Sequence, residues 1–196
     1  MDAHDGSAAT APGDRSARDL LRRETAAAHR AVEALPRMRR LLHRQVTRDD
    51  YAAVLCGFLP VHGGFEPRAA ALAGWSPGCG GERLRALQAD LRQLGREPVS
   101  AALPPAPALR GRAAALGACY VLEGSFLGGA VIAQHLRRQL GDATPLRYFA
   151  GAGIDVGGRW QAFLALLEAG LAAPGERAQA LCAARRSYHW LATVLP

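Results

Sequence analysis

Apolar residues recur at helical spacing along most of the chain, and this pattern predicts an all-α fold. The first run extends from Ser16 to Leu35, where apolar and small side chains fall on one stripe at alternating steps of four and three residues. We expect this helix to end before Pro36, because the residue preceding a proline disfavours helical geometry.

A second helix is predicted by a start signal rather than by periodicity alone. Thr47, with Asp50 three residues later, has the spacing of a capping box, and the apolar residues that follow extend through Leu59. Pro60 and the Gly63–Gly64 pair are expected to kink this helix.

The rest of the chain divides into helical stretches and connectors. A proline-rich connector is expected from Pro98 to Pro107, and an irregular piece from Pro145 to Gly153. The remaining helices are predicted at Glu82 to Leu94, Leu109 to Leu140, Ile154 to Leu171 and Gly175 to Val194.

Length and composition indicate one soluble domain. A chain of 196 residues with 49% hydrophobic and 21% charged residues can bury a substantial core without disulfides. Residues 1–17 lack the apolar core of a signal peptide and read as a disordered tail, which leaves residues 18–196 as the domain. The four cysteines are widely spaced, as expected for free thiols in a reducing cytoplasm.

The net charge of +7 favours anionic partners, and all 24 cationic side chains are arginine. Nucleic acid is the commonest such partner, but the arginines are scattered over every segment and no nucleic-acid motif is present. The charge therefore leaves an anionic cofactor or an acidic redox protein as the expected partner.

Several glycines share one strip of the helix predicted from Leu109 to Leu140. Gly117, Gly124 and Gly128 align on one face, and Gly129 widens the strip. Each interior glycine costs roughly 0.5 to 1 kcal/mol relative to alanine, so something must approach this backbone closely. A membrane helix dimer is disfavoured by Glu123 at the centre of the run, which leaves a neighbouring helix or a flat ligand.

His29 is the histidine best placed to bind a metal. It adjoins the apolar stripe of the first helix, one turn after Thr25, and Glu33 follows four residues later. That carboxylate is within helical reach of the ring nitrogen that does not bind metal, where it would fix the tautomer and raise the basicity of the ligand. A neutral imidazole of this kind suits heme iron.

Two segments resemble the heme oxygenase family, particularly its biliverdin-producing bacterial members. Leu21 to Glu33 is similar to the proximal helix of that family, with Thr25, His29 and Glu33 at matching intervals. Tyr120 to Gly129, with the sequence YVLEGSFLGG, resembles the distal helix. Both motifs occur in the family's order, and the resemblance covers the chain from Ser16 onward.

The resemblance implies a role for each matching residue. His29 would be the proximal iron ligand, and the backbone of Gly124 and Gly128 would lie over the heme. Ser125 falls where animal members carry a catalytic aspartate, so a side-chain acid is missing there. Thr25, Glu33, Tyr120 and Gly129 would line the heme site, and the candidates for pairing with the heme propionates are Arg22, Arg137, Arg138 and Arg159.

The implied reaction is the oxidative opening of heme to biliverdin, carbon monoxide and ferrous iron. Heme would be both cofactor and substrate, with dioxygen as co-substrate and electrons from an external donor such as a ferredoxin, a flavodoxin or a reductase. A bilin-accepting photoreceptor is a further expected partner. Neither nucleic acid nor a membrane is expected.

Three other functions remain open from the sequence. A heme carrier or sensor would share the ligand and the pocket without turnover. An enzyme on the related thiaminase-like helical scaffold would use a cysteine or carboxylates, and Cys119 lies near the glycine strip. A noncatalytic helical interaction module would not depend on His29.

Overall fold

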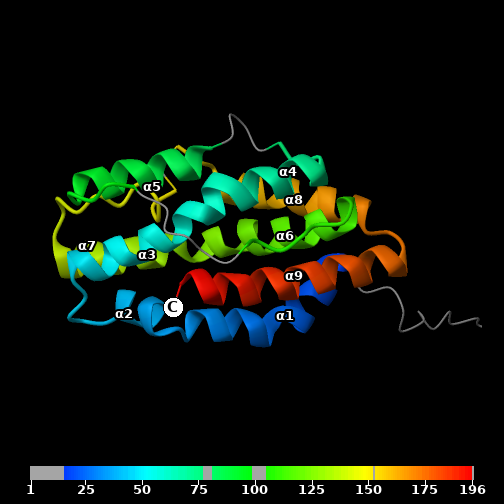
Figure 1. Cartoon of the computed structure of the whole chain (residues 1–196), viewed down its shortest axis with the longest axis horizontal. Coiled ribbons are helices and arrows are strands. Elements are labelled where there is room, and N and C mark those ends of the chain that lie inside the picture. Colours follow the sequence, from blue (N-terminus) through cyan, green and yellow to red (C-terminus); the bar gives the residue numbers. More distant parts are fainter. Residues whose placement is uncertain (1–15, 77–80, 99–104, 152, 196) are drawn as a thin grey trace, which may run out of the picture.

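The protein is a bundle of helices that run roughly parallel to the long axis of the molecule (Figure 1). The computed structural model describes residues 16–76, 81–98, 105–151 and 153–195, and within these ranges it contains helices and no strands. The all-α prediction is therefore confirmed. The expected tail at residues 1–17 lies almost entirely outside the described residues, although Ala17 already belongs to the first helix and is buried.

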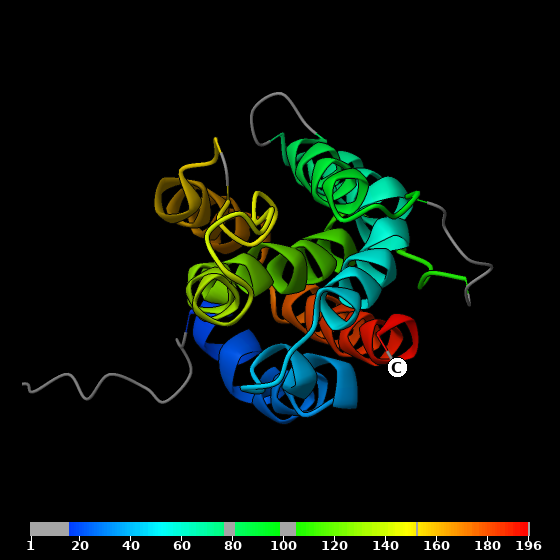
Figure 2. The same ribbon diagram turned by 90° about the vertical axis from the view of Figure 1, so that its left-hand side faces the viewer.

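Helix α6 (Arg112–Ser125) is the centre of the bundle. It packs against α4 (Glu66–Ala73), α8 (Val156–Gly170) and α9 (Pro174–Val194), and α9 in turn packs against α1 (Ala17–Glu33). Figure 2 shows the green α6 surrounded by these helices when the bundle is viewed end-on. The run of buried alanines in α6 permits this close packing, because small side chains let the helix axes approach.

The first helix is fixed at its start by two side chains. Ser16 accepts a hydrogen bond from the backbone of Asp19 (3.1 Å), as an N-cap residue does. Glu168 of α8 accepts hydrogen bonds from the backbone of Ala17 and Arg18 (both 2.9 Å). These contacts tie α1 to the bundle.

Pro36 does more than end the first helix. It is the first residue of a short helix, α2 (Pro36–Leu41), which the sequence analysis did not predict. Proline is well suited to this position, because its fixed φ is already helical and the first backbone N–H of a helix needs no partner within it.

The capping box at Thr47 and Asp50 is confirmed at the start of α3 (Arg48–Pro60). The expected kink follows as a π-helical turn, Val61–Phe65, which leads directly into α4. A turn of this type displaces the following residues around the helix axis, so it sets where His62 and Glu66 point.

The long helix expected from Leu109 to Leu140 is broken near its middle. A 3₁₀ turn at Phe126–Gly128 separates α6 from α7 (Gly129–Leu140). Helix α5 (Glu82–Gln93), together with α8 and α9, begins and ends within two residues of the predicted boundaries. The segment from Pro145 to Gly151 is irregular, as expected, and part of the predicted connector at Pro98 to Pro107 lies outside the described residues.

Candidate active site

A cavity of about 730 Å³ opens between the α1–α9 side of the bundle and the break between α6 and α7. This volume lies within the range of small-molecule sites, roughly 300 to 1,000 Å³. Its lining is mostly apolar and comes from residues far apart in the sequence, including His29, Met38, Phe58, Gly124, Ser125, Gly128, Ile132, Tyr148, Phe149, Tyr188 and Leu191. We call it the first cavity.

One wall of the first cavity carries His29. Its Nδ1 lies 3.4 Å from Oε2 of Glu33 one turn later, so Nε2 is the ring nitrogen left for a metal. The ring of Tyr188 on α9 packs edge-on against the imidazole, with centroids 5.8 Å apart. Thr25, one turn before His29, is buried and donates its hydroxyl to the carbonyl of Leu21 (2.7 Å). These contacts orient a half-exposed imidazole toward the cavity.

A second part of the wall is formed by bare backbone at the break between α6 and α7. A Cβ built on Gly128 meets no atom within 4 Å, and one on Gly124 meets only the Trp160 ring at 3.7 Å. Neither glycine is therefore required by helix packing. Ser125 donates its hydroxyl to the carbonyl of Leu122 (2.9 Å), which satisfies the hydroxyl within its own helix.

Two other glycines of the strip serve helix packing instead. A Cβ on Gly117 would lie 2.0 Å from the carbonyl oxygen of Ala180, and one on Gly129 would lie 2.6 Å from that of Phe149. Gly129 also lines the first cavity. Both interpretations that the sequence left open therefore apply to the strip. Gly117 and Gly129 make room for a neighbouring chain segment, and Gly124 and Gly128 leave space in a ligand cavity.

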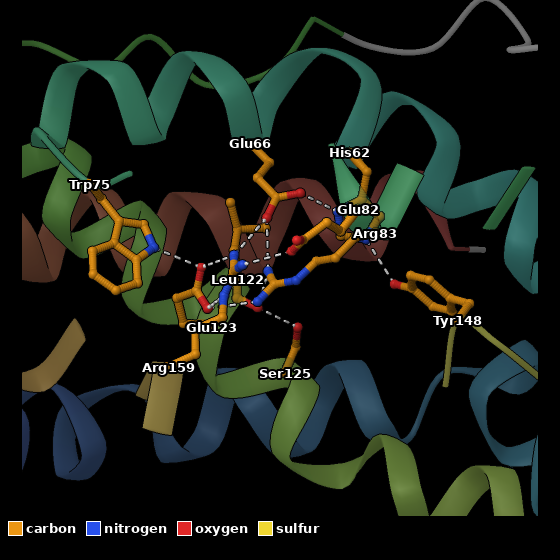
Figure 3. A network of polar contacts seen from close by, with 10 residues as sticks. All are labelled: His62, Glu66, Trp75, Glu82, Arg83, Leu122, Glu123, Ser125, Tyr148 and Arg159. Atoms are coloured by element: carbon orange, nitrogen blue, oxygen red, sulfur yellow. Dashed lines mark hydrogen bonds and ion pairs between the residues drawn. The ribbon is translucent and has the colours of Figure 1, made fainter. Parts of the chain in front are cut away.

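Behind the glycine wall lies a buried cluster of charged side chains (Figure 3). Glu123 accepts hydrogen bonds from Arg83 (2.6 Å), from Arg159 (2.7 and 2.8 Å) and from the indole of Trp75 (3.0 Å). Burial alone would raise the pKa of Glu123, but the hydrogen bonds and the two guanidinium charges outweigh burial and lower it. Glu123 is therefore an ionised carboxylate inside the bundle.

Glu66 and His62 extend this cluster toward the first cavity. Arg83 donates to Glu66 (2.8 Å), and Nδ1 of His62 lies 2.6 Å from the same carboxylate. The Tyr148 hydroxyl lies 2.8 Å from Nε2 of His62, and Tyr148 lines the first cavity. Burial would raise the pKa of Glu66, but His62, Arg83 and Arg159 lower it to about 2.

Asp90 on α5 holds the segment that carries Tyr148. This fully buried carboxylate accepts hydrogen bonds from the backbone of Arg147 (3.1 Å) and Tyr148 (2.9 Å) and from the Tyr51 hydroxyl (3.1 Å). Burial raises its pKa despite these hydrogen bonds. The wall formed by Tyr148 and Phe149 is thereby anchored to the bundle.

Comparison with known proteins identifies the family. The family model described as Heme oxygenase matches residues 15–195. A heme oxygenase of Xanthomonas campestris pv. campestris is 41% identical over 165 residues, which cover 81% of this chain and 96% of the relative. The chain belongs to the heme oxygenase family.

Two solved heme oxygenases share the fold. The NO- and CO-bound heme oxygenase of Neisseria meningitidis matches with a TM-score of 0.74 and 26% identity, over 93% of this chain and 91% of the other. The heme oxygenase of Leptospira interrogans matches with a TM-score of 0.71 and 18% identity, over 92% of this chain and 98% of the other. Oxidative cleavage of heme to biliverdin, carbon monoxide and ferrous iron is the chemistry of the family.

The first cavity fits the heme that a heme oxygenase degrades. An imidazole in the wall supplies a ligand suited to heme iron, and the wall at Gly124 and Gly128 lacks side chains that would fill the space a flat ring needs. Apolar side chains from α3, α7 and α9 complete the lining, as an apolar porphyrin requires.

The arginines expected to pair with propionates are dispersed. Arg22 is exposed on α1, and neither Arg22 nor Tyr120 lines the first cavity. The positive charge of Arg22, like that of Arg18, acts on the hydroxyl of Tyr120, whose pKa is nevertheless raised by burial. Arg137 and Arg138 are exposed at the end of α7 and do not line the first cavity. Arg159 does not line it either, because Glu123 binds its guanidinium on the other side of α6.

A second cavity, of about 470 Å³, lies beside the charged cluster. Its charged lining residues are His62, Glu66, Glu82, Arg83, Glu123 and Arg159. Cys119 also lines it but is 2% exposed, and burial raises the pKa of its thiol, so the thiaminase-like alternative finds no ready nucleophile there. The sequence analysis did not predict this cluster, although the His62–Glu66 spacing repeats that of His29 and Glu33.

The segment Arg112–Leu140, which includes α6 and α7, is long and apolar enough to cross a membrane by length and composition alone. Most of its apolar window is buried inside the bundle, and Glu123 in its middle is paired with two arginines. These are the properties of a core helix, which passes the same test.

Proposed function

We propose that the chain opens the heme ring with His29 as the axial ligand of iron and with Gly124 and Gly128 as the opposite face of the site. The observation that supports this proposal is that the imidazole and the two unfilled glycines line one cavity. Bound heme supplies the iron at which dioxygen is reduced, and the protein supplies placement and control of water.

The His29 side of the cavity and the bare backbone have different roles. Glu33 and Tyr188 hold the His29 ring, which fixes the height of the porphyrin in the cavity. The bare backbone leaves room for dioxygen and water, because no side chain projects from Gly124 or Gly128 into the cavity. Ser125 contributes its backbone to this wall, since its hydroxyl is satisfied by Leu122.

The acidic groups of heme would meet basic groups near the start of α1. Arg22 and Tyr120 are the candidates for binding a propionate, because a guanidinium and a phenol hydroxyl both donate to carboxylates and the Arg22 charge already acts on Tyr120. Arg137 and Arg138 remain candidates only for charges that extend beyond the cavity.

Turnover requires an external electron donor, and the basic surface favours an acidic one such as a ferredoxin, a flavodoxin or an acidic reductase. A bilin-accepting photoreceptor is a proposed recipient of the product. We place the reaction in the cytoplasm, where the cysteines remain reduced; the described ones, Cys56, Cys119 and Cys182, are free thiols.

Aerobic turnover separates the enzyme from a heme carrier. The purified protein is loaded with hemin, ascorbate is added under air, and the spectrum is followed while carbon monoxide is trapped. The proposal predicts loss of the Soret band, growth of a broad red biliverdin band and release of carbon monoxide. A stable ferrous-oxy spectrum without carbon monoxide would contradict it and would support a carrier or sensor.

A further inference from the structure

A chain of three side chains connects the two cavities through the bundle (Figure 3). Tyr148 lines the first cavity, Glu66 lines the second, and His62 lies between them with both ring nitrogens within hydrogen-bond distance of a partner. The distances are 2.8 Å from the Tyr148 hydroxyl to Nε2 and 2.6 Å from Nδ1 to Glu66. His62 is only 2% exposed, so it exchanges protons with little but these neighbours and the cavities.

The second cavity holds more acidic than basic side chains. Three carboxylates line it, Glu66, Glu82 and Glu123, against the two guanidiniums of Arg83 and Arg159. A proton held among these side chains therefore balances their charge, and charges interact strongly away from water.

The two protonation states of His62 orient the Tyr148 hydroxyl differently. A neutral ring with its proton on Nδ1, facing the ionised Glu66, accepts a hydrogen bond from Tyr148 at Nε2. The imidazolium donates from Nε2 to the Tyr148 oxygen, which turns the phenolic proton away from His62. Burial raises the pKa of Tyr148, so the phenol transfers protons without accumulating as phenolate.

We propose that His62 and Tyr148 relay protons from the second cavity to the first, onto the face of the heme opposite His29. In each transfer Tyr148 gives its hydroxyl proton to an acceptor in the first cavity and takes one from Nε2 of His62. The ring becomes neutral with its remaining proton on Nδ1. A half-turn of the ring exchanges its two nitrogens, and a proton from water in the second cavity then reaches the vacant nitrogen by way of Glu66 and restores the imidazolium. This inference rests on the proposed function, since it assigns the proton supply of that reaction.

The relay is tested on the hemin-loaded protein by substituting one relay residue at a time. Tyr148→Phe keeps the ring and removes only the relay oxygen, and His62→Gln keeps hydrogen bonding but cannot carry a proton. Ser187→Ala is the control, because it also removes a buried hydroxyl, here bonded to the Ala183 carbonyl of its own helix, and Ser187 lines neither cavity.

We expect Tyr148→Phe to bind hemin with an unchanged spectrum and to convert it about 100-fold more slowly, the usual range for losing a positioned proton donor. The rate of the variant should rise as the pH falls, since its protons come directly from solvent. The double variant should be no slower than either single variant, because both residues belong to one chain of transfers. Ser187→Ala should keep the wild-type rate and pH profile.

The experiment distinguishes a failure of the proposed function from a failure of the relay. A wild-type protein that neither binds nor degrades hemin contradicts the proposed function itself. A wild-type protein that degrades hemin, together with a Tyr148→Phe variant of equal rate and pH profile, contradicts the relay and leaves the proposed function standing.

Discussion

The ring of Tyr188 stands edge-on to the imidazole of His29, with ring planes at 86°. Thr25, which lies one turn before His29 on the same helix, partly offsets the rise that burial causes in the pKa of Tyr188. Helix α9 thus braces the candidate iron ligand through an aromatic contact that the sequence motif of α1 does not contain. The orientation of the His29 ring therefore depends on α1 and α9, although the sequence motif that indicated His29 as a ligand lies in α1 alone.

Tyr188→Ala should therefore weaken hemin binding without removing the ligand. The imidazole loses its edge contact, worth about 0.5 to 1.5 kcal/mol for an aromatic pair, so the hemin dissociation constant should rise roughly 2- to 10-fold. Hemin titration followed at the Soret band measures this change. Tyr188→Phe keeps the ring and should bind like the wild type; equal binding by all three proteins would contradict the bracing role.

Gly128→Ala should impair turnover while preserving the fold. Its added methyl meets no atom in the protein, so stability should be unchanged or higher by up to about 1 kcal/mol from better helix propensity. The methyl enters the oxygen side of the cavity, where it should slow ring opening or change the biliverdin isomer. Single-turnover kinetics with product chromatography measures both effects.

Gly117→Ala, at another glycine of the same strip, should have the opposite effect on stability. Its methyl would lie 2.0 Å from the backbone oxygen of Ala180, so α6 and α9 must separate, which costs about 1 to 3 kcal/mol or more. Urea unfolding should show this loss. If Gly117→Ala were as stable as the wild type, or Gly128→Ala turned over normally with the same product, the division of the glycine strip would be wrong.

Arg83→Met should destabilise the protein strongly, because it leaves Glu66 and Glu123 buried with fewer compensating charges. Breaking a buried ion pair from one side typically costs about 3 to 5 kcal/mol. The free energy of unfolding in urea measures the cost. Arg96→Met is a suitable control, since its ion pair with Asp49 is exposed and should contribute about 1 kcal/mol or less.

Acid should destabilise the folded state through Glu66. Its pKa of about 2 lies below the ordinary value of 4.5, so its contribution to stability is complete above pH 4.5 and is lost as the pH falls toward 2. Unfolding free energies across this range should fall less steeply for Glu66→Gln than for the wild type. An identical slope in both proteins would contradict the assignment, and the exposed Glu97→Gln serves as the control.

The parts of the site that follow from local sequence were predictable. The helix cap at Thr47, the kink after Pro60 and the position of His29 one turn from Glu33 all depend on residues within a few positions of one another. Local patterns of this kind determine helix ends and helix faces, and the structure confirms these features.

What could not be predicted depends on contacts between distant segments. The sequence offers Arg159 as a candidate for binding a propionate, whereas in the fold its guanidinium binds Glu123, 36 positions away. One partner of His62 is equally nonlocal, since Tyr148 lies 86 positions later. The sequence analysis placed Arg83 on a helix and expected a kink near His62, but only the π-helical turn and the packing of α5 bring His62, Glu66 and Arg83 together.

The central claim is that the imidazole of His29 binds the heme iron, and the hemin spectrum of His29→Ala tests it most directly. His29 is half-exposed, so the substitution should leave the fold intact, and His43→Ala removes an exposed histidine that does not line the first cavity. We predict that His29→Ala loses the histidine-ligated spectrum and regains it with added imidazole, while His43→Ala retains it. An unchanged histidine-ligated spectrum in His29→Ala would contradict the assignment.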